Sequence, residues 1–313
     1  MKSFLKELFF RTHASITPFK RFPENDSAII LNYHHIIPDK SERNSLLYGY
    51  SHRITSFEAQ LSWLQSKFQK SIDFSSHGSF VITFDDCSMS TFNHALPILE
   101  KYNVKAYFFV VEDDLGDILW IDKYFAWLSY VPRGIYIVND LECSISDFDS
   151  RMNAHHKFWS VLDHGYSSAE LLKDLDMAYS MNTIITSNLQ HADRLYTIGQ
   201  NEVNILKDLG HLIGFHSRSH QKLSTLPKDT LVTECTPLKN EYYNCDCIAV
   251  PFGTPDDYNS AVLETLREEG FGKILLNHPY RQKNQVYGRL NLPDSTSTSE
   301  IQYIVKHYIN SIR

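Results

Sequence analysis

Five short apolar runs alternate with stretches of helical periodicity, and this alternation constrains the fold more than any other feature of the sequence. The runs lie at residues 28–33, 80–84, 106–111, 211–215 and 247–251, and each is typical of a buried strand. Helices are expected at residues 56–67, 91–101, 199–209 and 259–269, of which the last two end at Gly210 and Gly270. Strands that alternate with helices predict an α/β fold with a mainly parallel sheet.

Residues 112–196 interrupt this alternation. Their apolar runs are weaker, they are rich in Trp and Tyr, and helices are expected near residues 118–129, 155–162 and 169–180. We interpret this stretch as an insertion between two strand–helix units of one domain that covers residues 26–313. Residues 1–25 are predicted to be an amphipathic helical segment, because Lys6 and Glu7 interrupt the apolar stretch that a secretory signal would need.

Composition excludes several classes of protein. The chain has 313 residues with 42% hydrophobic and 21% charged residues, which is a globular composition. A net charge of −7 without a Lys/Arg block argues against nucleic-acid binding, and no apolar run approaches the length of a membrane span. Five unevenly spaced cysteines without an export signal predict reduced thiols and a cytoplasmic location. The oligomeric state is left open.

Two polar motifs follow predicted strands. Asp85 and Asp86 come directly after residues 80–84, and they can take different roles at one site only if the chain bends there. A helix N-cap is the alternative for this pair. His216 and His220 follow residues 211–215 and would share a face if the segment were helical, although two ordinary loop histidines are the alternative in a chain with 15 His.

The position of these motifs favours a shared site. The carboxyl ends of strands are where α/β folds bind ligands. One Asp and two His form a three-ligand metal site with positions left for water, as in hydrolytic centres. Pro251 and Gly253 frame a rigid turn after the strand at residues 247–251, where a free N–H can stabilise an oxyanion, although most such triplets are only turns.

In this order the motifs resemble those of the polysaccharide deacetylases, also called NodB-homology domains or family-four carbohydrate esterases. The matching segments are TFDD at residues 83–86, HSRSH at 216–220 and AVPFG at 249–253, with LNYH at 31–34 and LWID at 119–122 similar to further family segments. The resemblance covers about residues 26–293, more loosely in the insertion at about 112–196. It implies an irregular (β/α) barrel of about seven strands with a helical insertion.

The resemblance also implies residue roles. Asp85 would be the general base, and Asp86, His216 and His220 would bind a divalent metal, usually Zn²⁺, with Co²⁺ or Mn²⁺ as substitutes. The Phe252 N–H would bind the oxyanion. We expect Trp120 and Asp122 to contact the sugar. Because Trp120, Tyr124 and Trp127 recur at helical spacing, an apolar helix face packed on the barrel is the alternative for these aromatic residues.

Two departures from the family pattern leave roles to be filled. The third motif commonly begins with Arg, but this chain has Ala249, so Arg289 is the candidate to orient Asp85, with a surface Arg as the alternative. The late Leu-x-His motif of the family, which supplies the general acid, has no clean match. His278, in Leu276-Asn277-His278, and His34 are the candidates, and another His or metal-bound water is the alternative.

Together these features predict a metal-dependent deacetylase that removes an acetyl group, more readily N-acetyl than O-acetyl, from a sugar or polysaccharide during surface glycan biosynthesis. An amidohydrolase or deformylase acting on another sugar-linked C–N bond is one alternative. A catalytically silent carbohydrate-binding relative is the other. In each case the expected partner is a carbohydrate.

Overall fold

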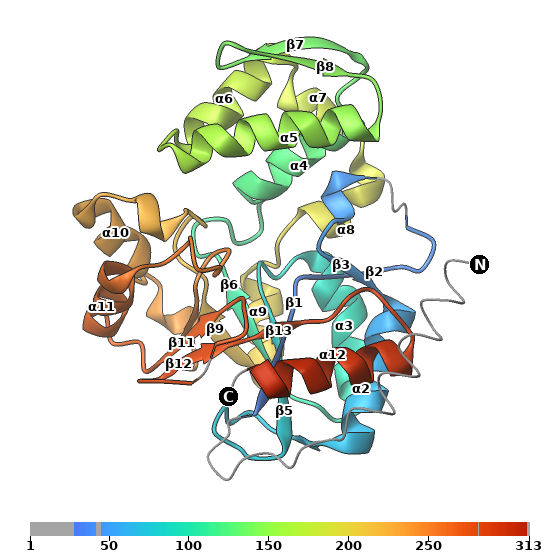
Figure 1. Cartoon of the computed structure of the whole chain (residues 1–313), viewed down its shortest axis with the longest axis vertical. Helices are drawn as coiled ribbons and strands as arrows, with labels where there is room; N and C mark the ends of the chain where they lie inside the picture. The colour runs from blue at the N-terminus through green and yellow to red at the C-terminus, as the bar shows by residue number, and fades with distance from the viewer. Residues whose placement is uncertain (1–27, 42–44, 281, 312–313) are drawn as a thin grey trace.

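A computed structural model describes residues 28–41, 45–280 and 282–311 (Figure 1). Its main sheet is wholly parallel and has the order β12-β11-β10-β9-β6-β5-β1-β13, with β4 beside β5. The strands are β1 (Ile29–Tyr33), β4 (Gln69–Lys70), β5 (Ser79–Phe84), β6 (Ala106–Val110), β9 (Leu212–Phe215), β10 (Cys247–Ala249), β11 (Lys273–Leu276), β12 (Val286–Gly288) and β13 (Leu290–Asn291).

The sheet curls into a nearly closed barrel because its two end strands are consecutive in the chain. β12 pairs with β11 and β13 pairs with β1, and Arg289 alone separates β12 from β13. The eight strands of this order therefore form a nearly closed ring, in which β12 and β13 follow one another with one residue between them. The predicted irregular (β/α) barrel of about seven strands is confirmed.

Side chains alternate between the inside and the outside of the barrel. β1, β5 and β6 are buried at every position, as expected for parallel strands covered on both faces. One cluster of buried residues fills the interior and includes Ile30, Val81, Phe109, Leu275 and Tyr287. The intervening strand residues pack outward against helices.

The helices that cover the barrel form its outer layer (Figure 1). They are α2 (Ile54–Lys67), α3 (Met89–Lys101), α9 (Gln200–Asp208), α10 (Lys228–Cys235), α11 (Ser260–Glu268) and α12 (Thr298–Ser311). A short parallel pair, β2 (His35–Ile37) and β3 (Ser51–Arg53), continues from β1. No helix among the described residues is both long and apolar enough to cross a membrane.

The insertion forms a lobe above one end of the barrel (Figure 1). It contains α4 (Trp120–Tyr130), α5 (Phe148–Asp163), α6 (Ser168–Ala178), α7 (Met181–Thr186), α8 (Ala192–Leu195) and an antiparallel hairpin of β7 (Gly134–Val138) and β8 (Leu141–Ile145). The lobe has its own apolar core around α4, which includes Tyr124 and Trp127.

The helical insertion is confirmed, but the hairpin was not expected. The outer face of β7 is exposed, so its apolar residues do not form the continuous buried run that marks the barrel strands. The amphipathic segment predicted at residues 1–25 lies outside the described residues, and the domain boundaries stay predictions.

Candidate metal centre and active-site cleft

The chain bends sharply where β5 ends. Asp86 and Cys87 both have left-handed backbone conformations, with φ of 64° and 50°. Such conformations are uncommon for residues other than glycine and are concentrated at functional sites. The bend separates the two carboxylates that sequence alone places side by side, so that Asp85 and Asp86 meet different partners.

Asp86, His216 and His220 bring three potential ligand atoms together in buried surroundings. Asp86 Oδ1 lies 3.4 Å from His216 Nε2 and 3.3 Å from His220 Nε2. One ligand atom from each residue lies within 4.8 Å of the other two, and Asp86 Oδ1 is buried without a hydrogen-bond partner among the described residues. His216 Nδ1 lies 2.8 Å from the Ala249 carbonyl, which therefore accepts its proton and leaves Nε2 as a free ligand atom. This donor set fits a divalent ion.

His216 and His220 lie in a loop, and residues 216–220 do not form the helix that was considered for this segment. Ser217 and His220 have φ of 61° and 56°, which turn the chain so that the two imidazole rings lie 4.9 Å apart. The His220 N–H donates to Ser217 Oγ at 2.9 Å, and Trp120 Nε1 donates to the His220 carbonyl at 2.9 Å. Helical spacing therefore suggested a pair of residues that the structure does bring together, but the loop and not a helix does so.

Arg289 forms a two-pronged ion pair with Asp85. Its Nη1 and Nη2 each lie 2.6 Å from one carboxylate oxygen, and Arg289 is fully buried. Asn32 Nδ2 donates to the same carboxylate at 3.2 Å. Burial would raise the pKa of Asp85, but Arg289 and then His216 outweigh it and hold this pKa below its usual value. The predicted contact is present, and the surface alternative for Arg289 is wrong.

The Pro251–Gly253 turn places Phe252 beside His220, one of the three candidate metal ligands. Phe252 and Gly253 have φ of 59° and 64°, and the Phe252 ring centroid lies 4.7 Å from that of His220. A Cβ on Gly253 would lie 2.7 Å from the Asn277 nitrogen, so only glycine fits this turn. The Phe252 N–H has no acceptor among the described residues and is free to bind a ligand.

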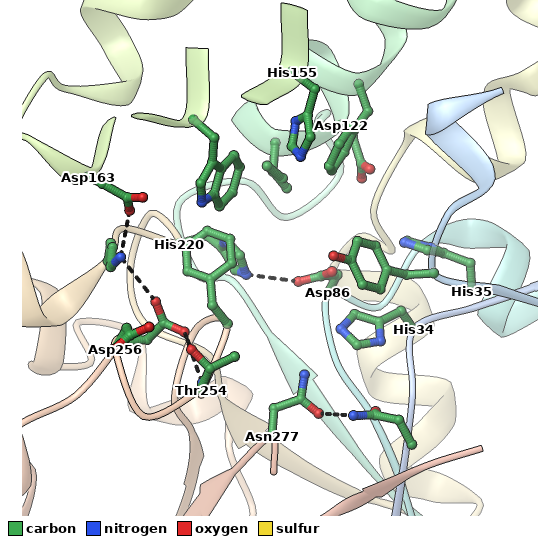
Figure 2. A pocket seen from close by; sticks show the side chains of 18 of the residues that line it. His34, His35, Asp86, Asp122, His155, Asp163, His220, Thr254, Asp256 and Asn277 are labelled. Carbon is green, nitrogen blue, oxygen red and sulfur yellow. Dashed lines mark hydrogen bonds and ion pairs between the residues drawn. The ribbon is translucent and has the colours of Figure 1, made fainter. Parts of the chain in front are cut away.

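A cleft of about 490 Å³ opens above these groups, between the barrel and the insertion (Figure 2). Five residues singled out in the sequence line it: His34, Asp86, Asp122, His220 and Phe252. The others are His35, Tyr50, Ile121, Phe125, His155, Trp159, Asp163, Arg194, Lys222, Thr254, Asp256, Asp257, Asn277 and Asn291.

The two candidates for the general acid lie in different places. His34 lines the cleft, near enough to Asp86 and Asp85 for both to affect its pKa, which burial nevertheless lowers. His278 is not among the lining residues. Its Nε2 lies 3.1 Å from the Tyr258 hydroxyl, and the two rings stack at 5.9 Å. Its neighbour Asn277, the first residue after β11, lines the cleft instead.

The three aromatic residues of α4 that the sequence singled out, Trp120, Tyr124 and Trp127, do not line the cleft. Tyr124 and Trp127 are buried in the core of the insertion, as the structural alternative predicted. Trp120 contacts Phe252 at 6.4 Å between ring centroids and is absent from the lining of the cleft, but it lines a smaller pocket beside the cleft.

Asp122 does line the cleft. Arg194 Nη1 donates to its Oδ1 at 2.7 Å, and burial raises the pKa of Asp122 to about 6 against the opposing effect of Arg194.

Several residues of the site gave no signal in the sequence. Arg194 is 72 positions from Asp122 and lies in α8, far from every motif. Lys222 lies two residues after the HSRSH motif, but nothing in the sequence distinguishes it from an ordinary surface lysine. Asn32 and Asn277 lie inside the segments LNYH and Leu276-Asn277-His278, which were selected for their histidines. Their position beside those histidines was the only signal in the sequence for a role at the site.

Comparison with known proteins shows which proteins this chain resembles. The polysaccharide deacetylase family model matches residues 75–135. Poly-beta-1,6-N-acetyl-D-glucosamine N-deacetylase of Staphylococcus epidermidis is 32% identical over 113 residues, which cover 30% of this chain and 39% of that protein. A Staphylococcus aureus protein of the same name is 28% identical over 120 residues, covering 32% of this chain and 41% of the relative. The chain thus spans about two fifths of the length of the curated relatives that it matches.

Two solved structures share the fold. Streptococcus pyogenes deacetylase PplD in complex with acetate has a TM-score of 0.54 at 14% identity, over 90% of this chain and 98% of that one. IcaB from Ammonifex degensii has a TM-score of 0.54 at 16% identity, over 90% and 98% of the two chains.

Proposed function

This chain resembles the polysaccharide deacetylases in sequence motifs and in barrel fold, and from that premise we propose that it is a metal-dependent hydrolase that removes N-acetyl groups from a glycan. One observation carries the proposal. The Asp86–His216–His220 cluster and the Asp85–Arg289 ion pair stand side by side at the carboxyl end of the barrel, and the cleft opens above them.

The donor set fits zinc best among common divalent ions. Two imidazole nitrogens and one carboxylate are ligands that zinc accepts in catalytic sites, with positions left for water and substrate. Asp86, His216 and His220 would hold the ion, which when bound supplies a Lewis acid for the acetyl carbonyl and for water. The unpartnered Asp86 Oδ1 supports this assignment.

The protein's own groups would then carry the proton transfers. Asp85 is ionised at neutral pH because Arg289 keeps its pKa low, so it is available to accept a proton from the attacking water. The Phe252 N–H would donate to the oxygen of the former carbonyl as negative charge develops there. His34, which lines the cleft, would give a proton to the leaving amine. Water adds to the amide carbon, and acetate and a free amino sugar leave.

The curated relatives suggest the substrate. They are named for poly-beta-1,6-N-acetyl-D-glucosamine, and we propose a β-1,6-linked N-acetylglucosamine chain as the substrate here, in the synthesis of a surface or biofilm glycan. The cytoplasmic location predicted from the sequence stays a prediction.

Acetate release tests the proposal. Zinc-loaded protein is incubated with β-1,6-linked N-acetylglucosamine oligomers, and acetate and new amines are counted. We expect equal amounts of both, and Asp85→Asn should retain its metal and lose roughly 10²–10⁴ in rate. Formate from an N-formyl substrate without acetate would favour the deformylase alternative. Neither acid from a metal-loaded protein would favour the silent carbohydrate-binding relative.

A further inference from the structure

A second hollow opens beside the cleft, and the proposed function does not use it. This side pocket has a volume of about 210 Å³ and lies between the insertion and the barrel. Its lining includes Leu162 at the end of α5, Tyr166 in the connection to α6 and Ser168 at the start of α6. Gln221 and Pro227 line it from the barrel loop on either side of residues 223–225.

The side pocket is continuous with the cleft. The two hollows share four lining residues, Trp159, Asp163, Lys222 and Phe252. The Trp159 ring stands at 87° to that of Phe252, with centroids 5.5 Å apart, so aromatic surface passes from one hollow into the other. At 210 Å³ the side pocket is smaller than most ligand sites, which fits an extension of the main cleft better than a separate site.

Polar groups stand at the junction of the two hollows. Lys222 Nζ lies 2.7 Å from Asp163 Oδ1 on α5 and 3.6 Å from Asp257 Oδ1, and Figure 2 shows Asp163 at this edge of the cleft. The Lys222 and Asp163 side chains are 21% and 41% exposed, so the pair adds little stability while its donors and acceptors remain accessible to a ligand. Gln221 Nε2 donates to Ser168 Oγ at 2.9 Å on the far side.

We propose that the side pocket binds the neighbouring sugar residue of the same glycan chain while the residue to be deacetylated occupies the cleft. The inference rests on the proposed function and specifies its substrate as a chain of at least two sugar residues. Apolar pyranose faces suit the Trp159 surface, and hydroxyl groups suit the Lys222–Asp163 pair.

The charge of the side pocket argues against a nucleotide-linked sugar. Lys222 is the one cation among the described residues that line it, and Asp163 and Asp257 already face that cation. A diphosphate would meet two carboxylates there at the cost of like-charge repulsion. A neutral sugar hydroxyl meets no such cost, so the pocket favours a glycan over an activated monosaccharide.

Chain-length dependence tests the inference. For β-1,6-linked N-acetylglucosamine oligomers of one to five residues, kcat/KM is measured from acetate release, and the readout is the ratio of the pentamer value to the monomer value. The wild type should show a ratio well above one. Thr225→Trp, which places a large ring at the side pocket, should lower that ratio about tenfold, mainly through KM.

Thr230→Trp is the matched control, because Thr230 is exposed on α10 and does not line the side pocket. It should keep the wild-type ratio. A wild-type ratio near one, or a wild-type ratio in Thr225→Trp, would overturn the inference. If metal-loaded protein releases no acetate at any length, the proposed function fails, and calorimetric binding of the intact pentamer decides the inference separately. An affinity about tenfold weaker in Thr225→Trp would support the side pocket, and equal affinities would refute it.

Discussion

At the scale of single residues, Arg289 connects Asp85, the proposed general base, to the strands of the barrel. Arg289 joins strands across the barrel, because its Nε donates to the Leu276 carbonyl at 3.2 Å and Nη1 donates to Asn32 Oδ1 at 3.0 Å. The pair is buried, so each charge depends on the other. A guanidinium with two parallel bonds fixes the carboxylate in orientation as well as in charge.

Arg289→Lys tests that link. Lysine keeps the positive charge and loses the second prong, so the pKa of Asp85 should rise and the acidic limb of the kcat/KM profile should move to higher pH. Because the folded-state pKa of Asp85 is depressed, the stability it contributes is present above the unfolded pKa and is lost as pH falls through the folded pKa. The variant should therefore lose about 2–4 kcal/mol of unfolding free energy at neutral pH, measured by urea titration. An unchanged acidic limb would contradict a positioning role for Arg289.

The general acid is the second test at this scale. His34→Ala should flatten the basic limb of the kcat/KM profile and lower the rate roughly 10²-fold or more, because the leaving amine loses its proton donor. His278→Ala serves as the comparison, since that ring stacks on Tyr258 outside the cleft lining. If His278→Ala alone changes the basic limb, the two assignments are reversed.

Residue-level prediction identified groups that the structure brings together where those groups stand in short motifs, and it stopped where their proximity depends on folding. Asp86, His216 and His220 stand in short motifs after strands, so they were found as a set. Arg289 was found because the missing arginine at Ala249 required a replacement. Arg194 and Lys222 line the cleft because segments far apart in the sequence pack together, and no local pattern encodes that packing.

At the scale of elements, α4 supports the metal centre through its first residue. Trp120 begins α4 and donates its indole N–H to the carbonyl of His220, whose backbone is strained. The helix thereby holds the loop that carries His220.

Trp120→Phe should weaken zinc affinity about tenfold or more, since supporting contacts of ligands have effects of that size. Trp127→Phe is the matched control. Trp127 Nε1 donates to the Tyr179 carbonyl at 3.0 Å inside the insertion, so this change also removes one indole hydrogen bond but lies in the core of the lobe. Competition titration with a chelator measures both affinities. Equal zinc affinity in Trp120→Phe and the wild type would show that α4 does not support the site.

Strands were predicted correctly from the sequence where they are buried on both faces. The five apolar runs became strands of the barrel because parallel strands covered on both faces need apolar side chains throughout. The β7–β8 hairpin escaped prediction because its pairing is antiparallel and one face meets solvent, which leaves no continuous run.

At the scale of the whole molecule, the barrel and the insertion have separate apolar cores. Stability should therefore differ between the parts. Amides of β5 and β6, in the middle of the sheet, should exchange hydrogen most slowly, and those of β7 and β8 should exchange at least about a hundredfold faster. Native-state exchange followed by mass spectrometry checks this order. Equal protection of the hairpin and β5 would indicate one cooperative unit.

The central claim is that Asp86, His216 and His220 form a metal centre that serves hydrolysis. Zinc stoichiometry, measured by mass spectrometry on metal-stripped and reloaded protein, tests it most directly. The account predicts one tightly bound zinc per chain in the wild type and in Asp85→Asn, and loss of that zinc in the Asp86→Ala, His216→Ala, His220→Ala triple variant. Full zinc occupancy in a folded triple variant would contradict the account.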